Sequence, residues 1–193
     1  MEKELIINGI KYIRVEEDNF KIGDIVKFNG YDWYIIKIEN SNATLLMKNV
    51  LSESEVQELF DEEYLDSDND VCFNKDKANN DWNYSIIRKI LNTIFLDEFD
   101  EYELNVMRTN YDEDKYSEDH VRLLTIREAE RLEDDIRVCG IAYWTMSPSH
   151  FNSNDTSAFV WYGYSSGTLY HNWATSAYGV RPVINLSTDL LGS

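Results

Sequence analysis

The chain has 193 residues, of which 43% are hydrophobic and 13% aromatic, which is enough apolar material for one globular domain with a single core. Its formal net charge is −18, and residues 142–193 contribute only −1 of it, which leaves −17 for residues 1–141. This acidic balance argues against nucleic acid as a partner, because binding to phosphates needs a basic surface.

No apolar run approaches the roughly 20 residues of a membrane span, so we expect no membrane insertion. The first residues lack the basic and apolar regions of a signal peptide, which favours a cytoplasmic protein as synthesised, with a virion-associated protein as the alternative.

Turn signals in the first 50 residues predict antiparallel hairpins. Asn29-Gly30 separates β-rich stretches at 22–28 and 31–38, and Asn-Gly accepts the positive φ angles of a type I′ turn. The turn at 39–42 leads into a further strand around Ala43 to Met47.

Residues 5–15, with Asn8-Gly9 between two short apolar stretches, are interpreted as a shorter hairpin of the same kind. The chain is therefore read as a single domain, 1–193. Within it, 1–21 form an N-terminal extension or hairpin and 187–193 form a tail.

Helical periodicity and capping residues predict two main helices. The first begins after Ser85 as N-cap, and its apolar stripe is expected in the core. The stripe residues are Ile86, Ile90 and Ile94 alongside Ile87, Leu91 and Phe95. The second follows Thr125, which forms a capping box with Glu128, and it turns Ala129 and Leu132 inward.

A further helix is expected to begin at Ser52, which has capping-box spacing to Glu55, before the chain turns strongly acidic. In that acidic stretch, Asp66, Asp68 and Asp70 have the D-x-D-x-D opening of a calcium loop.

The sixth position of that loop is Val71 where a calcium loop has Gly, and the twelfth is Lys77 where it has Glu. An exposed acidic loop is therefore favoured, weak calcium binding stays open, and no metal or other cofactor is assigned. Cys72 and Cys139 are interpreted as buried reduced cysteines, with one disulfide as the alternative.

After Gly140 the chain becomes aromatic and almost uncharged. A strand is predicted over 141–149, stopping at Ser147-Pro148. A hairpin follows, with strands at 158–164 and 168–173 around a turn at 165–167.

A last strand is expected over 179–186. Because Pro182 has no N–H to donate, that strand is predicted to lie at a sheet edge or to be interrupted there. Arg181, the only Lys or Arg among the last 52 residues, is expected in a buried hydrogen-bond network beside Pro182.

The stretch WYGYSSGTLYHNW (161–173) combines rigid aromatic side chains with Ser, Gly and Asn, which is the composition of antibody contact loops. Phe159, Trp161 and Gly163 share one face of the strand, and Val160, Tyr162 and Tyr164 share the other. Aromatic β segments also form cores, so one face can be buried. The predicted ligand-binding residues are Trp161, Tyr162, Tyr164, Tyr170, His171, Asn172 and Trp173.

Several separated segments resemble one known family in their order along the chain. They are VKFNGYDWYIIKIENSNATLLMKNVL, DWNYSIIRKILNTIF, HVRLLTIREAERL, YWTMSPS and GVRPVINL. Together they resemble the bacterial family called domain of unknown function 6273, over residues 22–186. The chain departs from the family where Tyr143 to Met146 replace W-W-L-R and where Ser149 replaces a glycine.

That family is similar to the C-type-lectin-like fold, which also includes formylglycine-generating enzymes. The resemblance implies a compact α+β domain with twisted antiparallel sheets, two main helices and a loop-rich aromatic face near the C-terminus. It implies a structural role for the motif residues Trp144, Ser147, Pro148, Arg181 and Pro182.

The sequence favours a protein that is not an enzyme. Ser147, His150 and Asp155 have no triad spacing. The C-terminal cysteine pair of formylglycine-generating enzymes and the calcium-binding motifs of sugar-binding lectins are missing.

The expected function is a binding module of bacterial or phage origin, in a tail or surface-associated protein, that recognises a protein or glycan through its aromatic surface. The alternatives are an acidic inhibitor, assembly protein or nucleic-acid mimic that binds a basic partner, and an enzyme of unknown class. The sequence assigns no oligomeric state.

Overall fold

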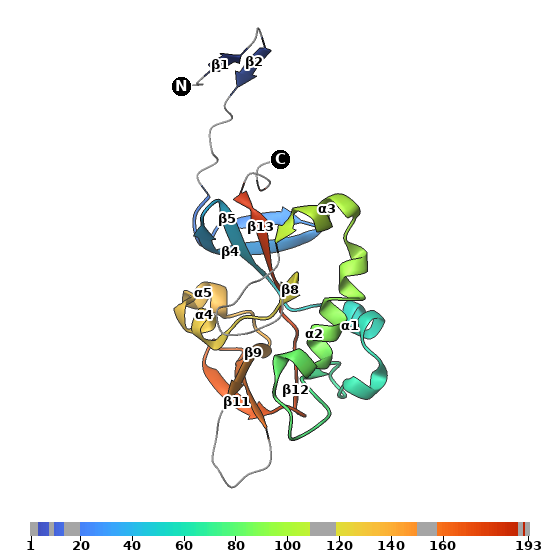
Figure 1. The fold of residues 1–193 in the computed structure, drawn as a ribbon. Coiled ribbons are helices and arrows are strands. Elements are labelled where there is room, and N and C mark those ends of the chain that lie inside the picture. The colour runs from blue at the N-terminus through green and yellow to red at the C-terminus, as the bar shows by residue number, and fades with distance from the viewer. Residues whose placement is uncertain are drawn as a thin grey trace.

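The protein has a mixed α+β fold, built mostly from antiparallel sheets with a few short helices (Figure 1). The computed structural model describes residues 4–7, 10–13, 20–108, 119–149, 158–188 and 191. Within these ranges no helix has the length and apolar character needed to span a bilayer.

The largest sheet begins with the predicted meander β3 (Ile25–Phe28), β4 (Tyr31–Glu39) and β5 (Asn42–Met47). Asn29 and Gly30 have φ angles of 46° and 74°, so the turn has the two positive φ angles that the sequence predicts. The second turn repeats this arrangement at Asn40 and Ser41, with φ angles of 50° and 62°.

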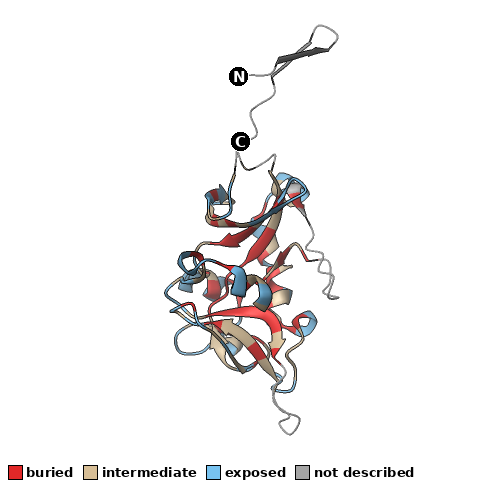
Figure 2. Ribbon diagram, turned by 90° about the vertical axis from the view of Figure 1, so that its left-hand side faces the viewer, coloured by how far each residue is buried: buried red, intermediate tan, exposed pale blue. Residues whose placement is uncertain are grey.

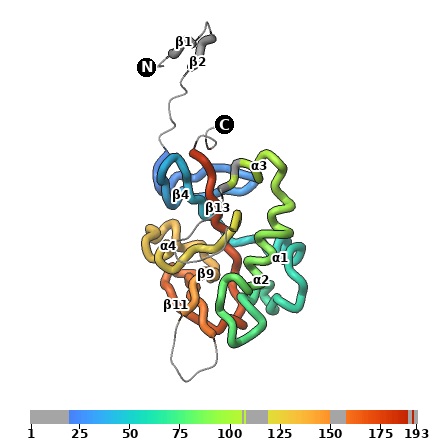
Figure 3. The backbone as a smooth tube through the Cα atoms, in the orientation of Figure 1, coloured from blue at the N-terminus to red at the C-terminus, as the bar shows by residue number. Residues whose placement is uncertain are grey.

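The C-terminal strand β13 (Val183–Ser187) lies inside this sheet. It pairs with β5 on one side and with β7 (Met107–Arg108) and β8 (Val121–Arg122) on the other. Of the two alternatives predicted for this strand, an edge position or an interruption at Pro182, the structure shows the second, because β13 begins one residue after Pro182 and lies inside the sheet. In Figure 3 the red C-terminal segment runs up the domain to reach this sheet.

Two smaller sheets lie at the other end of the domain. One has the order β11-β10-β9 and contains β9 (Tyr143–Ser149), β10 (Phe159–Gly163) and β11 (Leu169–Trp173). The other pairs β6 (Val71–Cys72) with β12 (Ala177–Tyr178). β9 continues through Pro148, where it was expected to stop, and an edge strand tolerates a proline that donates no hydrogen bond.

The N-terminal stretch forms the short antiparallel hairpin expected there. Its strands are β1 (Glu4–Ile7) and β2 (Ile10–Ile13). They pair in register from Glu4 opposite Ile13 to Ile7 opposite Ile10.

The described residues contain five short α-helices, where two main ones and a further one after Ser52 were expected. They are α1 (Glu53–Leu59), α2 (Ile86–Leu91), α3 (Glu101–Val106), α4 (Ile126–Arg131) and α5 (Asp134–Arg137). Single 3-10 turns lie at Glu62–Tyr64, Trp82–Tyr84 and Phe95–Glu98. The predicted capping boxes of Ser52 and Thr125 are both present.

The helix after Ser85 is shorter than its apolar stripe. The Ser85 hydroxyl accepts the Arg88 N–H at 3.0 Å, which confirms the predicted cap. The helix ends because the Asn92 side chain pairs with Val121 of β8, donating to its carbonyl at 2.7 Å and accepting its N–H at 3.1 Å. Ile94 then lies beyond the helix and is 45% exposed, so it leaves the stripe that was expected to be core.

Buried residues concentrate on the inner faces of the strands and helices (Figure 2). Among them is Arg181, 1% exposed, whose guanidinium donates to the Met47 carbonyl at 2.8 Å and to the Lys48 carbonyl at 2.9 Å. The predicted buried hydrogen-bond network is therefore confirmed. Arg181 holds the start of β13 against the end of β5.

Candidate functional site

The predicted contact surface lies on the hairpin of β10 and β11. Trp161 lies opposite His171, and Tyr162 lies opposite Tyr170. The turn contains Gly167, whose φ of +85° favours glycine and whose Cβ position lies 2.9 Å from Val138.

Gly163 anchors this hairpin to the core. A Cβ at Gly163 would lie 2.7 Å from the buried ring of Tyr143, so the absent side chain lets the ring pack directly against the strand. Thr145 of β9 donates its hydroxyl to the Trp161 carbonyl at 2.8 Å. The hairpin backbone is therefore held in place by residues of β9.

Strand alternation divides the predicted residues between two faces of the hairpin. We call the face of Tyr162, Tyr164, Tyr170 and Asn172 the tyrosine face. We call the face of Phe159, Trp161, His171 and Trp173 the tryptophan face. The sequence predicted this alternation for β10, and the cross-strand pairs extend it to β11.

The tyrosine face is partly covered by Tyr178 of β12. The rings of Tyr162 and Tyr178 are stacked, with centroids 4.1 Å apart and planes at 12°. Trp144, fully buried, meets both rings edge-on at 6.2 and 4.7 Å. Asn172 donates to the Tyr178 hydroxyl at 2.8 Å. Tyr162 and Asn172 therefore belong to a packed cluster.

Partial burial, and then the neighbouring Tyr178 hydroxyl, raise the pKa of Tyr162 well above its usual value. The hydroxyl therefore stays neutral across the physiological range. This leaves Tyr162 without the ionised form that a base or nucleophile uses.

The outer part of the tyrosine face is open. Tyr170 is 51% exposed and Tyr164 is 47% exposed. Their rings meet edge-on with centroids 6.2 Å apart, and Tyr170 also contacts Tyr162 at 6.2 Å. Each exposed ring is thus supported by another ring and loses less side-chain freedom on binding.

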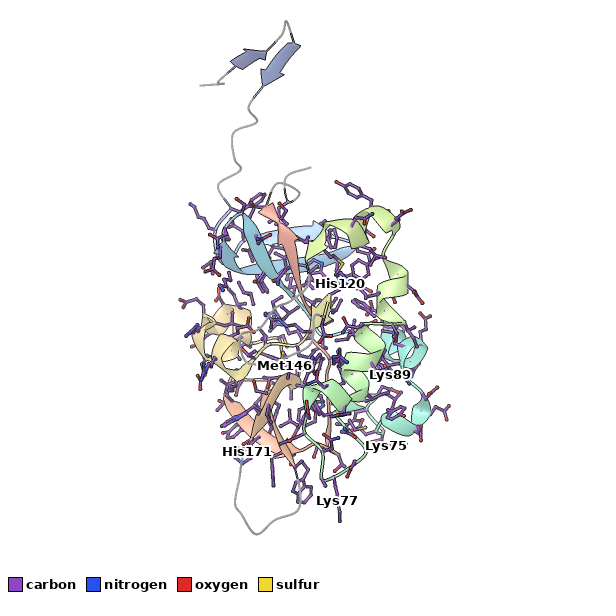
Figure 4. All side chains as sticks on the ribbon, viewed as in Figure 1. Lys75, Lys77, Lys89, His120, Met146 and His171 are labelled. Carbon is purple, nitrogen blue, oxygen red and sulfur yellow. The ribbon has the colours of Figure 1, made fainter. Side chains whose placement is uncertain are left out.

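On the tryptophan face, the His171 ring lies edge-on between Phe159 and Trp161, at 5.6 and 5.3 Å. Figure 4 labels His171 beside β11. Trp173, at the end of the strand, is 54% exposed. Phe159, Trp161 and His171 are each half-buried, so Trp173 is the most accessible group of this face.

The three most exposed predicted residues therefore lie on or next to β11. They are Tyr164, Tyr170 and Trp173, and we call them the edge surface. β11 pairs only with β10 among the described strands, so it forms the outer edge of its sheet. Tyr170 and Trp173 project from opposite faces of this edge. A partner that contacts both must approach along the edge rather than onto a flat face.

The expected motif residues lie inside the fold. Trp144 donates its indole N–H to the Val71 carbonyl at 2.8 Å. The Ser147 hydroxyl accepts the Ile126 N–H at 3.0 Å at the start of α4, where it supports the helix end. His150 and Asp155, written with Ser147 as a triad, lie outside the described residues.

No group of three or more His, Cys, Asp or Glu side chains is positioned to hold a metal ion within the part of the chain that the structure describes. In the acidic loop, an Asp66 carboxylate oxygen accepts the N–H groups of Asp68 and Asp70, at 2.9 and 3.0 Å. Both cysteines are free thiols, so the alternative of a disulfide is wrong. Cys72 is buried as expected, whereas Cys139 is half-buried, so the expected burial is wrong for Cys139.

Two features of the surface were missed by sequence reasoning. Tyr178 completes the tyrosine cluster although it comes from another sheet, and its only signal is its place in the same aromatic stretch. A concavity lined by basic residues beside α2 was also missed, because its three basic residues form no recognisable motif in an acidic sequence.

Comparison with protein-family models, with curated proteins and with solved structures gives no match for this chain.

Proposed function

We propose that this protein is a non-enzymatic recognition module that binds a protein or glycan through the edge surface of Tyr164, Tyr170 and Trp173. The observation that carries this proposal is the exposure of three large aromatic side chains, each about half accessible, on one hairpin. Aromatic anchors of this kind dominate the binding energy of interfaces.

The rigid support of the hairpin that carries these residues is consistent with the same function. The hairpin backbone is fixed by Gly163 against Tyr143 and by the Thr145 hydroxyl on the Trp161 carbonyl. A surface that is rigid before binding loses little conformational entropy when the partner arrives. Tyr and Trp also keep a polar atom for hydrogen bonding, which suits both protein and carbohydrate partners.

We further propose that the fold is C-type-lectin-like, within the domain of unknown function 6273 family, and that the protein acts in a bacterial or phage tail or surface-associated assembly. The burial of Trp144 and Arg181 supports this reading, since both belong to the motifs that carry the resemblance. A loop-rich aromatic face near the C-terminus is also what the resemblance implies.

The test compares substitutions of similarly exposed aromatic residues inside and outside the edge surface. The wild-type protein is screened against a glycan array and a library of purified bacterial surface proteins. Each ligand is then measured with Tyr170→Ala, Trp173→Ala and the control Tyr102→Ala, whose ring on α3 is 62% exposed. We expect each of the first two changes to weaken binding by about tenfold or more, since central aromatic anchors contribute 2 kcal/mol or more.

Ligand binding that is unchanged by both hairpin variants would reject the proposal. The same conclusion follows if Tyr102→Ala weakens binding as much as they do. Circular dichroism on all three variants checks that the fold is retained.

A further inference from the structure

A concavity whose lining contains none of the edge-surface residues lies beside α2. Its volume is about 550 Å³, within the range of small-molecule sites. It is lined by Tyr64, Asn74, Lys75, Asn83, Tyr84, Ser85, Ile86, Arg88, Lys89, Asn92 and Thr93. These include three basic side chains and no carboxylate, although the chain has twice as many acidic as basic residues. We call this surface the basic concavity.

Arg88 is fixed at this surface by a buried partner. Its Nε and Nη2 donate to the Asp119 carboxylate at 3.0 and 2.8 Å, and Asp119 is 3% exposed and also accepts the Trp82 indole N–H at 2.8 Å. The third guanidinium nitrogen, Nη1, makes no hydrogen bond within the described residues. Because Arg88 lines the concavity and its guanidinium is held by Asp119, this nitrogen is available to donate to a ligand there.

Lys75 approaches the concavity from the segment after β6. Its ammonium lies 4.7 Å above the centre of the Tyr64 ring and forms an ion pair with the exposed Glu63. A cation held over a ring keeps its other hydrogen-bonding directions free. An exposed ion pair contributes little, so it is readily exchanged for a stronger anion.

Lys89 is exposed on α2, and no ion pair is found for it in the described parts of the chain. Figure 4 labels Lys75 and Lys89 on the same side of the molecule, beside α2. Tyr84, which is 71% exposed, adds an accessible aromatic ring to the lining. The surface thus offers cationic donors next to a ring on which a planar or sugar group can stack.

We propose that the basic concavity binds a small phosphate monoester, such as a nucleoside monophosphate or a sugar phosphate. Three donors from separate side chains suit the three terminal oxygens and double charge of a phosphate better than the two oxygens of a carboxylate. The overall charge of −18 selects for small ligands, because a polyanion would meet repulsion over its whole length.

The test measures binding to the full-length protein by isothermal titration calorimetry. The ligands are adenosine monophosphate, ribose 5-phosphate, inorganic phosphate and adenosine. We expect both phosphate esters to bind and adenosine to bind far more weakly. Stronger binding of adenosine monophosphate than of ribose 5-phosphate would identify the nucleotide as the preferred source of the phosphate, and the reverse order would identify the sugar phosphate.

Lys89→Gln should weaken binding of the phosphate esters by about tenfold, the value of one charge-assisted hydrogen bond. Lys77→Gln is the matched control, because Lys77 lies two residues from Lys75 but outside the lining. Trp173→Ala should leave phosphate binding unchanged, which separates this test from that of the edge surface. The proposal is overturned if no phosphate ester binds at millimolar concentration, or if Lys77→Gln and Lys89→Gln weaken binding equally.

Discussion

Tyr162 and Tyr170 lie opposite each other on the tyrosine face, yet they should respond very differently to truncation. Both were predicted to contact a ligand. The Tyr162 ring is stacked on Tyr178 and meets Trp144, whereas the Tyr170 ring is 51% exposed. Replacing each by alanine therefore tests which of them supports the fold.

For Tyr162→Ala we expect a loss of about 3 kcal/mol in the free energy of unfolding. About 2 kcal/mol comes from the buried apolar part of the ring, and about 1 kcal/mol from the stacked pair with Tyr178. For a chain of this size, this loss lowers the melting temperature by about 6–12 °C. For Tyr170→Ala the loss should stay below about 1 kcal/mol, because about half of this residue is already exposed to water.

The assay is urea unfolding at neutral pH, followed by tryptophan fluorescence, with the slope against denaturant compared between variants. Equal losses for the two variants would refute the assignment of Tyr162 to the core and Tyr170 to the edge surface. The Tyr162 variant should not be used to test ligand binding, since its effect on binding and on folding would be mixed.

Two further changes test other parts of the structure. Gly163→Ala should destabilise the protein by about 1–3 kcal/mol in thermal or urea unfolding, because the new Cβ would lie 2.7 Å from Tyr143 and force that ring to move; an unchanged stability would contradict this packing. Partial burial, and then the charges of Asp66 and Asp68, raise the pKa of Asp70 to about 6. The folded protein therefore binds the Asp70 proton more tightly than the unfolded chain does. The protein loses this contribution to its stability as the pH rises from about 4 to about 6. Asp70→Asn should therefore stabilise the protein by about 1 kcal/mol at pH 7, a value reduced because the side chain is partly exposed. Near pH 4 the gain should be small. A gain in stability that is equal at both pH values would show that it does not come from the raised pKa of Asp70.

Much of the local structure could be predicted because it depends on a few neighbouring residues. Asn29-Gly30 specifies its turn by accepting two positive φ angles, and the capping boxes at Ser52 and Thr125 satisfy the first backbone N–H groups of their own helices. Helix length was harder to predict. The helix after Ser85 ends at Asn92 because that side chain pairs with β8, a contact that no local pattern contains.

The candidate site was likewise predicted in part from the sequence and decided in part by tertiary contacts. The sequence by itself determined that residues 158–173 form an aromatic hairpin and which of its residues share a face, since both follow from turn chemistry and strand alternation. It also determined that Arg181 needs buried hydrogen-bond acceptors. Only the tertiary structure decided which aromatic residues are exposed, because Tyr162 is covered by Tyr178 from a strand that pairs with β6, about a hundred residues earlier in the chain. Only the structure likewise placed Lys75 beside Arg88 and Lys89 of α2, because Lys75 lies in an irregular segment whose path no periodicity predicts. Alternation fixes the face of a strand on which a side chain lies, but what covers that face depends on other elements of the fold.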